Sequence, residues 1–216
     1  MLQEDDLTSR QTSRTFLKLE VTLKNTLIYI LLKNMNHKTF LLAILTFCLT
    51  ITSCVKEKLE NTYNTQEDRI DQFIEKNRYT NTDTLRVVYN GGSTRLVTKE
   101  GEGEMLNSDG MIAFYYAGYT FNGSISNANL FTTNHVETAT SAGWELTDES
   151  YDILTIDLTE YELIKGLFNG LTGVRAGEEC QIFFSGKYAF GKRALGIVPA
   201  NSALVYKIWV ESISNE

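Results

Sequence analysis

The sequence predicts an α+β fold in which several antiparallel strands pack against one short helix. Short segments rich in β-branched and aromatic residues recur between turn signals from residue 85 to residue 213, and such segments are typical of strands. The segment 160–174 instead has the pattern of an amphipathic helix, and Gly177 follows its end. Successive antiparallel strands with a single helix packed against them indicate an α+β domain.

The first 53 residues are predicted to be a targeting segment that does not belong to the fold. Residues 35–38 are basic, residues 39–49 are almost wholly apolar and small residues follow, which is the pattern of a secretory signal peptide over 35–53. The apolar part is shorter than the roughly 20 residues that span a bilayer. Residues 1–34 precede this signal, so we predict that they are an extension from a mis-assigned start and that Met35 is the initiator.

The segment 51–54 resembles a bacterial lipobox, in which the cysteine receives diacylglycerol and becomes the mature N-terminus. We therefore predict lipidation of Cys54 and attachment to a membrane through that lipid. No aspartate follows Cys54, which resembles the sorting of outer-membrane lipoproteins, facing the periplasm or exposed at the surface. The alternative is an uncleaved N-terminal anchor.

Charge and cysteine content limit the possible functions. The formal net charge is −7 and there is no long run of Lys or Arg, so we expect no nucleic-acid partner. The strand context of Cys180 indicates a small buried hydrophobe, with a reactive thiol as the alternative. The acidic side chains do not have the regular spacing of a metal-binding motif, so we predict no metal site, and we also predict no cofactor. His135 is predicted to be an exposed loop residue.

The mature chain is predicted to consist of a tether with a short amphipathic helix, 54–83, and a domain, 84–216. Ile70, Phe73 and Ile74 have helical spacing between residues 66 and 77, and such a stripe usually packs on its own domain. The segment 90–92, Asn-Gly-Gly, separates two strand-like segments and indicates a hairpin. Strands are predicted at 85–89, 94–98, 111–119, 153–158, 179–185 and 202–213, and the helix at 160–174.

A series of short motifs, covering roughly residues 96–213, resembles the FKBP-type peptidyl-prolyl cis-trans isomerases in order and spacing. The motifs are Gly101-Glu102-Gly103, Tyr115-Tyr116-Ala117-Gly118, Leu163-Ile164-Lys165-Gly166, Val174-Arg175-Ala176-Gly177, Tyr188-Ala189-Phe190-Gly191 and Gly196-Ile197-Val198-Pro199. The resemblance implies an FKBP-like antiparallel sheet wrapped on one short helix. With the signal at 35–54, the chain looks like a bacterial lipoprotein form, similar to gliding-motility-associated FKBP-like lipoproteins.

The resemblance also implies an apolar pocket that binds a proline-containing peptide. Carried over by position, the catalytic residues are Tyr116, Phe131, Ile164, Leu167, Phe190, Ile197 and Tyr206, and the substrate-binding residues are Leu163, Val198 and Tyr188. Such a pocket needs no nucleophile, metal or cofactor, because it favours the twisted amide over the planar one. The backbone N–H of Ile164 is expected to hold a substrate carbonyl.

Three positions depart from the family pattern. Leu167 stands where members usually carry a tryptophan at the pocket floor. Thr132 stands where they usually carry a carboxylate, and Phe190 where they usually carry a tyrosine. Both of the latter changes remove a polar group that positions ligand, and each lost hydrogen bond costs about 0.5–1.5 kcal/mol.

We therefore expect a lipid-anchored isomerase that assists the folding of envelope proteins by acting on their X-Pro segments. The alternative is a non-catalytic FKBP-like lipoprotein that binds a peptide or a partner, and the three departures motivate it. A third interpretation is a structural lipoprotein whose pocket is filled by Trp144, which lies in the long connection 120–151.

Overall fold

The structure is a computed structural model that describes residues 37–80, 86–145 and 147–215. The chain divides into two compact units, 1–58 and 59–216. The predicted extension 1–34 lies outside the described residues, and from residue 37 onward the predicted signal segment is part of a helix. No helix in the described ranges is long and apolar enough to cross a membrane.

Helix α2 spans His37–Thr80 and differs in length from the sequence prediction. The segment 54–65, predicted to be a tether, is helical and continuous with the predicted helix 66–77. The physical reason is local: residues 54–65 contain no glycine or proline, and their Lys, Glu and Leu side chains favour a helix. Tyr63 also extends the apolar stripe of Ile70 and Ile74 by two turns, and all three side chains are buried.

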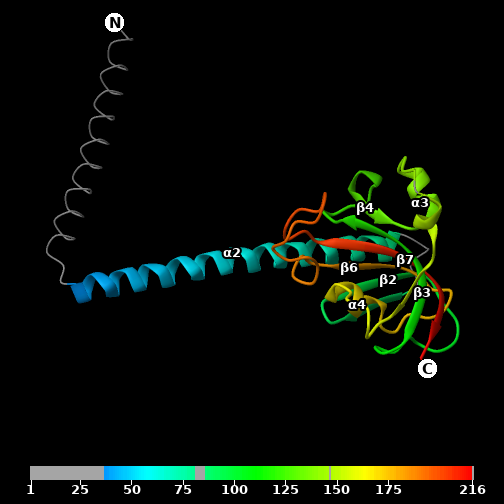
Figure 1. The fold of residues 1–216 in the computed structure, drawn as a ribbon, viewed down its shortest axis with the longest axis horizontal. Coiled ribbons are helices and arrows are strands. Elements are labelled where there is room, and N and C mark those ends of the chain that lie inside the picture. Colours follow the sequence, from blue (N-terminus) through cyan, green and yellow to red (C-terminus); the bar gives the residue numbers. More distant parts are fainter. Residues whose placement is uncertain (1–36, 81–85, 146, 216) are drawn as a thin grey trace, which may run out of the picture. The chain divides into compact units, whose positions relative to one another are not determined.

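The domain is built on one seven-stranded sheet whose pairs are all antiparallel (Figure 1). The strands are β1 (Arg86–Asn90), β2 (Ser93–Lys99), β3 (Met111–Thr120), β4 (Leu130–Thr133), β5 (Leu154–Asp157), β6 (Glu179–Phe184) and β7 (Leu204–Ser214). Their order is β1-β2-β6-β7-β3-β4, and β5 pairs with the first half of β3. The predicted α+β fold is confirmed, and each predicted strand is present within two residues of its expected bounds.

The helices of the domain are shorter than expected. Helix α4 spans Lys165–Leu171, whereas the sequence predicted 160–174. Its start is delayed because the Asp157 side chain accepts from the backbone N–H of Thr159 at 2.8 Å and so closes a turn. The structure also contains α3 (Val136–Ser141) and two short 3₁₀ helices, η1 (Asn127–Asn129) and η2 (Asp148–Tyr151), which the sequence did not predict.

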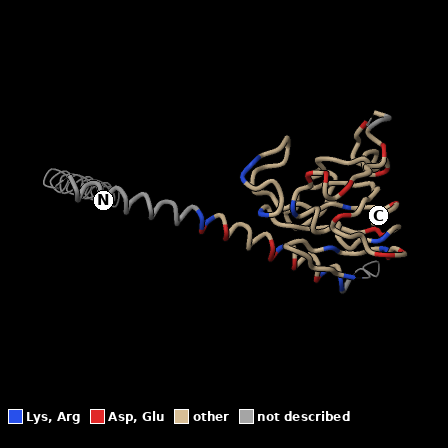
Figure 2. Tube along the Cα trace, turned by 60° about the horizontal axis from the view of Figure 1, so that its bottom comes forward, with Lys and Arg blue, Asp and Glu red and all other residues tan. Residues whose placement is uncertain are grey.

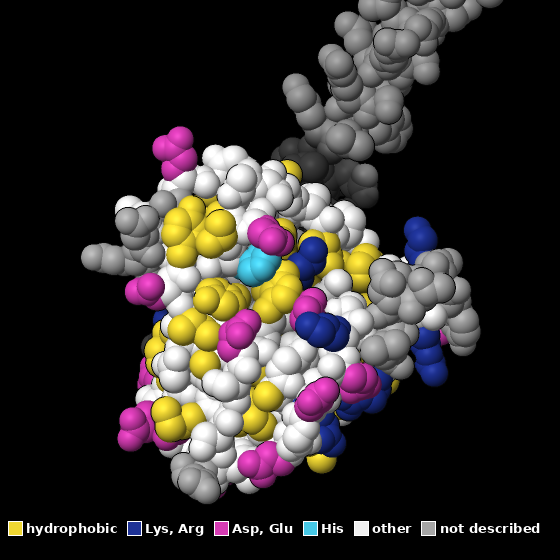
Figure 3. All heavy atoms as spheres, turned by 90° about the vertical axis from the view of Figure 1, so that its right-hand side faces the viewer, with side chains coloured by type: hydrophobic (Ala, Val, Ile, Leu, Met, Phe, Trp, Pro, Cys, Tyr) yellow, Lys and Arg dark blue, Asp and Glu magenta, His cyan; other side chains and the backbone are white. Residues whose placement is uncertain are grey.

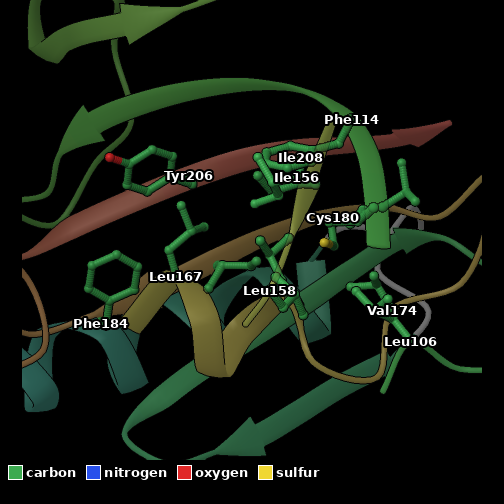
Figure 4. Close-up of a cluster of buried hydrophobic side chains, with 14 of the residues drawn as sticks. Leu106, Phe114, Ile156, Leu158, Leu167, Val174, Cys180, Phe184, Tyr206 and Ile208 are labelled. Atoms are coloured by element: carbon green, nitrogen blue, oxygen red, sulfur yellow. The ribbon is translucent and has the colours of Figure 1, made fainter. Parts of the chain in front are cut away.

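The sheet has a hydrophobic layer on each face. Alternation along β6 directs Phe184 to one face and Phe183 to the other. Phe184 packs with Leu167 and the rest of α4 in the cluster of Figure 4. Phe183 packs with Ile70 and Ile74 of α2, as the apolar stripe of that helix predicted. Cys180 is 2 % exposed on the α4 face, so its predicted structural role is confirmed.

The α2 face of the sheet continues past the helix into a more open surface. There His135 stacks on Trp209, with ring centroids 3.9 Å apart and planes at 5°. Figure 3 shows a histidine on this face with hydrophobic side chains beside it and with acidic and basic side chains also at its border. The prediction of an exposed loop histidine was wrong, because His135 precedes α3 and the short helix folds the ring onto the sheet. Acidic and basic residues are interspersed over the described chain in Figure 2.

Candidate functional site

A cavity of about 690 Å³ lies beside the α4 face of the sheet. Its walls come from β3, β4, β5, β7, the start of α4 and the loop between β6 and β7, and most of them are aromatic or aliphatic. The lining residues are Phe114, Tyr116, Phe131, Thr132, Trp144, Leu154, Tyr161, Leu163, Leu167, Phe190, Leu195, Gly196, Ile197 and Tyr206. The cavity is therefore an apolar site with a few hydroxyl groups at its surface.

Most of the predicted site residues meet in this cavity. They come from five separate segments of the chain, and they are Tyr116, Phe131, Leu163, Leu167, Phe190, Ile197 and Tyr206. Three others do not line it. Val198 is buried in the core below, and Tyr188 packs outside α4, with Lys165 Nζ 5.8 Å from its ring centroid. The Ile164 side chain also lies outside the lining.

Tyr206 is one of the buried residues that line the site, and its ring contacts other aromatic rings. Phe131 meets it edge-on at 5.9 Å and 90°, and Phe184 stacks on it at 6.1 Å and 15°. The side chain is 6 % exposed. Burial raises the pKa of the Tyr206 hydroxyl, and the nearby Tyr116 raises it further, so the phenol stays neutral.

The Tyr206 hydroxyl faces away from the buried cluster (Figure 4). Within the described chain no group forms a hydrogen bond with it. A buried tyrosine hydroxyl usually finds a partner. Because this one borders the cavity, a ligand carbonyl or a water in the cavity is its available acceptor.

The backbone at Ile164 offers a second donor. Ile164 precedes α4 in an extended conformation, with φ −61° and ψ 140°. Its carbonyl accepts from Leu167 and Phe168 at the start of the helix, at 3.0 and 3.1 Å. Among the described residues no acceptor receives its N–H. A free N–H at this place can hold the carbonyl of a bound peptide.

Part of the chain matches a known protein family. Residues 109–211 match the family described as FKBP-type peptidyl-prolyl cis-trans isomerase. This part of the chain is therefore similar to the FKBP-type isomerases. The match contains every residue of the cavity, from Phe114 to Tyr206.

Three curated proteins resemble parts of this chain. The chain is 41 % identical over 54 residues to a peptidyl-prolyl cis-trans isomerase of Saccharomyces cerevisiae, covering 25 % of this chain and 13 % of that protein. It is 23 % identical over 117 residues to FK506-binding protein 1 of Aspergillus oryzae, covering 54 % of this chain and 94 % of that protein. The Neurospora crassa FK506-binding protein 1A is 38 % identical over 64 residues, covering 28 % of this chain and 53 % of that protein. The chain thus spans a small part of the yeast protein and about half of the Neurospora one.

The chain also resembles parts of several solved structures. The chain is similar to FkpA from Escherichia coli, with 17 % identity, a TM-score of 0.47, and coverage of 84 % of this chain and 74 % of that chain. The three FKBP domains of wheat FKBP73 give 21 % identity, a TM-score of 0.46, and coverage of 61 % of this chain and 50 % of that chain.

The rim of the cavity is apolar and open. Ile197, Leu195 and Tyr161 line it although they are 69 %, 54 % and 50 % exposed. Leu195 and Val198 exchange two backbone hydrogen bonds of 3.0 and 2.9 Å, which form a tight turn. Gly196 supplies the left-handed backbone of that turn, with φ 54°. The turn therefore holds the exposed Ile197 side chain at the cavity rim, where a ligand can contact it.

Several residues that line the cavity were not predicted from the sequence. Phe114 shares a face of β3 with Tyr116, and Leu154 pairs with Phe114 across the β3–β5 ladder. Strand alternation alone could have found Phe114. Leu195 and Tyr161 sit on irregular loops that carry no periodic signal. Trp144 lines the cavity but leaves it open, which contradicts the interpretation that its loop fills the pocket.

Proposed function

We propose that this chain is a peptidyl-prolyl cis-trans isomerase that acts on X-Pro bonds in exposed segments of other proteins. The observation that carries the proposal is the open apolar cavity of the FKBP-type domain, with two unpartnered donors at its edge, the Tyr206 hydroxyl and the Ile164 N–H. A proline ring fits an apolar cavity, and the carbonyls on either side of it need donors.

The reaction needs binding and no covalent chemistry. Resonance gives the amide C–N bond its double-bond character and a rotational barrier of about 18–20 kcal/mol. The twisted amide has lost that resonance and its charge separation, so an apolar cavity holds it better than the planar form. Both isomers of X-Pro are populated, so a site that prefers the twisted amide lowers the barrier in both directions.

The lining residues divide this task. Phe131, Leu167 and Tyr206 form the floor and hold the pyrrolidine ring. Phe190 and Ile197 lie on the loop side and cover the bound peptide. The Ile164 N–H donates to the carbonyl of one neighbouring residue and the Tyr206 hydroxyl to another, which fixes the peptide while the X-Pro bond turns.

A specific observation also favours a second function, binding without catalysis. Leu167, Thr132 and Phe190 all lie on the cavity, so the three departures from the family pattern fall within the site itself. Leu167 widens the floor, and Thr132 and Phe190 present fewer polar groups to a ligand. Peptide capture is retained in such a cavity even where rotation is not accelerated.

A protease-free isomerisation assay on X-Pro peptides with varied X tests the proposal. We expect the protein to raise the isomerisation rate in proportion to its concentration. Phe131→Ala should remove the increase, because the floor loses its ring. Phe168→Ala is the matched control, since Phe168 packs on the same core from α4 but lies outside the cavity.

Two negative results have different meanings. No rate increase with saturable binding of an X-Pro peptide would replace the isomerase by the binding function. Neither rate increase nor binding from a folded sample would overturn both functions.

We further propose that the protein is a lipid-anchored envelope lipoprotein whose X-Pro clients are envelope proteins. The support is the sequence pattern alone: the basic start, the apolar segment and the 51–54 motif that ends at Cys54. Labelling with a radioactive fatty acid in a bacterial host tests it. Label should be lost in Cys54→Ser and kept in Cys48→Ser, and label retained in both variants would contradict the assignment.

A further inference from the structure

The loop between β6 and β7, residues 185–201, carries much of the cavity wall. Phe190, Leu195 and Ile197 reach the cavity from this loop. The two ends of the loop lie against each other, because a methyl group at Gly186 would contact the Asn201 carbonyl oxygen at 2.5 Å. None of the described α2 side chains lines the cavity, yet the loop ends contact this helix through Gln66.

Gln66 of α2 joins the two ends of the loop. Its side-chain oxygen accepts from the backbone N–H of Gly186 at 2.8 Å. Its side-chain nitrogen donates to the carbonyl of Asn201 at 2.6 Å. The Gln66 side-chain amide therefore acts as both acceptor and donor. It bridges Gly186 and Asn201, the two ends of a loop about 120–135 residues away in the sequence, and we call this pair of loop ends the neck.

Tyr63, one turn earlier on α2, holds the same end. Its hydroxyl donates to the Asn201 side-chain oxygen at 2.8 Å, and its ring is 6 % exposed. Asn201 has a left-handed backbone with φ 59°, which is uncommon for a residue other than glycine. The Asn201 N–H in turn donates to Gly191 at 2.6 Å, next to Phe190. The contact of Tyr63 with Asn201 thus continues to the cavity wall.

Other α2 contacts add to the same junction. Glu67 accepts from the hydroxyl of Ser185, the first residue of the loop, at 2.9 Å. Glu60 pairs with Lys187 at 3.2 Å, but both side chains are about half exposed, so this pair contributes little. The part-buried contacts of Gln66 and Tyr63 are the stronger ones, because water competes less for them.

We propose that Gln66 and Tyr63 are positioning residues for the cavity: helix α2 clamps the 185–201 loop, and peptide affinity depends on that clamp. The physical reason is entropic. The loop contains three glycines, Gly186, Gly191 and Gly196, and its Leu195 and Ile197 side chains are exposed, so a loop whose ends were not held would sample many conformations. Holding the two loop ends together keeps Phe190 and Ile197 in place opposite the cavity floor.

Backbone amide hydrogen exchange across 186–201 is the first test, and it does not depend on the proposed isomerase activity. Gln66→Ala in the full chain should raise exchange at the loop amides about 5–10-fold, with no such rise in β6 or β7. Gln72→Ala is the matched control, since Gln72 is exposed on the same helix. Equal loop exchange in wild type and Gln66→Ala would overturn the clamp.

Gln66→Glu gives a second test, which also covers the case in which Gln66→Ala does not fold. A neutral carboxylic acid can accept from Gly186 and donate to Asn201, as the amide does, whereas a carboxylate faces the Asn201 carbonyl oxygen with no proton to donate. The charged groups around this position are Glu60 and Glu67 on α2 and Lys187 on the loop, and they are the same in both proteins.

The expected result for Gln66→Glu is a KM for an X-Pro peptide about 5–10-fold above wild type at pH 7.5, with kcat changed less. The ratio to wild type should fall toward one as the pH is lowered through the range in which the new carboxyl takes up its proton. A ratio that stays constant with pH, or stays at one throughout, would count against the clamp. The KM readout rests on the proposed function, so changed loop exchange without any isomerisation would leave the clamp standing and remove the isomerase.

Discussion

Arg95 and Glu178 form an ion pair inside the domain. Arg95 Nε lies 3.2 Å from the Glu178 carboxylate, and their side chains are 4 % and 0 % exposed. The other nitrogens of Arg95 donate to the carbonyls of Gly170, Thr172 and Gly173 at 2.7–3.0 Å, where α4 ends. One buried guanidinium therefore ties β2 to the helix that borders the cavity.

Replacing Arg95 by Met should reduce the free energy of unfolding by about 3–5 kcal/mol. The variant leaves the Glu178 carboxylate buried with a more distant partner, Arg86 at 3.4 Å, and frees three carbonyls at the helix end. Urea unfolding measures the change. Lys99→Met is the matched control, because its pair with Glu179 is exposed and should contribute less than about 1 kcal/mol. Equal losses in the two variants would show that burial of the pair is not what matters.

Tyr206→Phe should separate activity from stability. We expect kcat/KM for an X-Pro peptide to fall about 2–10-fold, since one hydrogen bond to the substrate is lost, while the melting temperature changes little. Tyr119→Phe is the control, because Tyr119 is buried on the opposite face of the sheet and its hydroxyl contacts Thr138. That variant should lose stability and keep its activity. Unchanged kcat/KM in Tyr206→Phe would mean that the hydroxyl does not reach the substrate.

Alternation and turn signals predicted the sheet well, because a strand that is buried on at least one face must repeat its apolar residues with period two. The elements that were missed have no such requirement. Strand β4 has four residues and pairs only with the end of β3, and α3 is a six-residue helix in a long connection. The predicted helix 66–77 was too short because residues 54–65 are polar and were taken for a tether, although no glycine or proline in that segment breaks a helix.

The sequence indicated seven of the residues that line the cavity, through their positions in the segment that resembles the FKBP-type isomerases. Tyr116 and Phe131 both line the cavity, Tyr116 from a regular β3–β7 pairing and Phe131 from the register shift between β3 and β4. Tyr188 and Val198 lie one or two residues from cavity residues, and a loop without regular hydrogen bonding does not reveal which side chain turns inward. The contacts of Gln66 with the loop depend on tertiary packing across more than a hundred residues, so no local pattern indicates them.

The His135 ring predicts how stability depends on pH. Burial lowers the pKa of His135 below its usual 6.5, and the repulsion from Lys207 acts in the same direction against the attraction of Glu137 and Glu179. A lowered pKa in the folded state means that the unfolded chain binds the proton more readily. The stabilising contribution is therefore complete above pH 6.5 and is lost as the pH falls toward the pKa of the folded state.

Urea unfolding at pH 7.5 and pH 5.5 tests this sign. We expect the wild type to lose stability between these values, and His135→Phe to lose less, because phenylalanine keeps the stack on Trp209 without a titrating group. Carboxylates titrate mostly below this window, so they affect both proteins alike. A wild type that gains stability relative to His135→Phe on acidification would reverse the sign.

Ile197→Ala tests whether the exposed rim of the cavity contributes binding energy. The side chain is 69 % exposed, so its loss should change the free energy of unfolding by less than about 0.5 kcal/mol. Burying it under a peptide contributes about 1–2 kcal/mol, so the variant should raise KM roughly 5–20-fold. Met105→Ala, which removes another exposed apolar side chain outside the cavity, should leave KM unchanged. If both variants leave KM at the wild-type value, the peptide does not contact the turn at Gly196, and binding is confined to the floor formed by Phe131 and Tyr206.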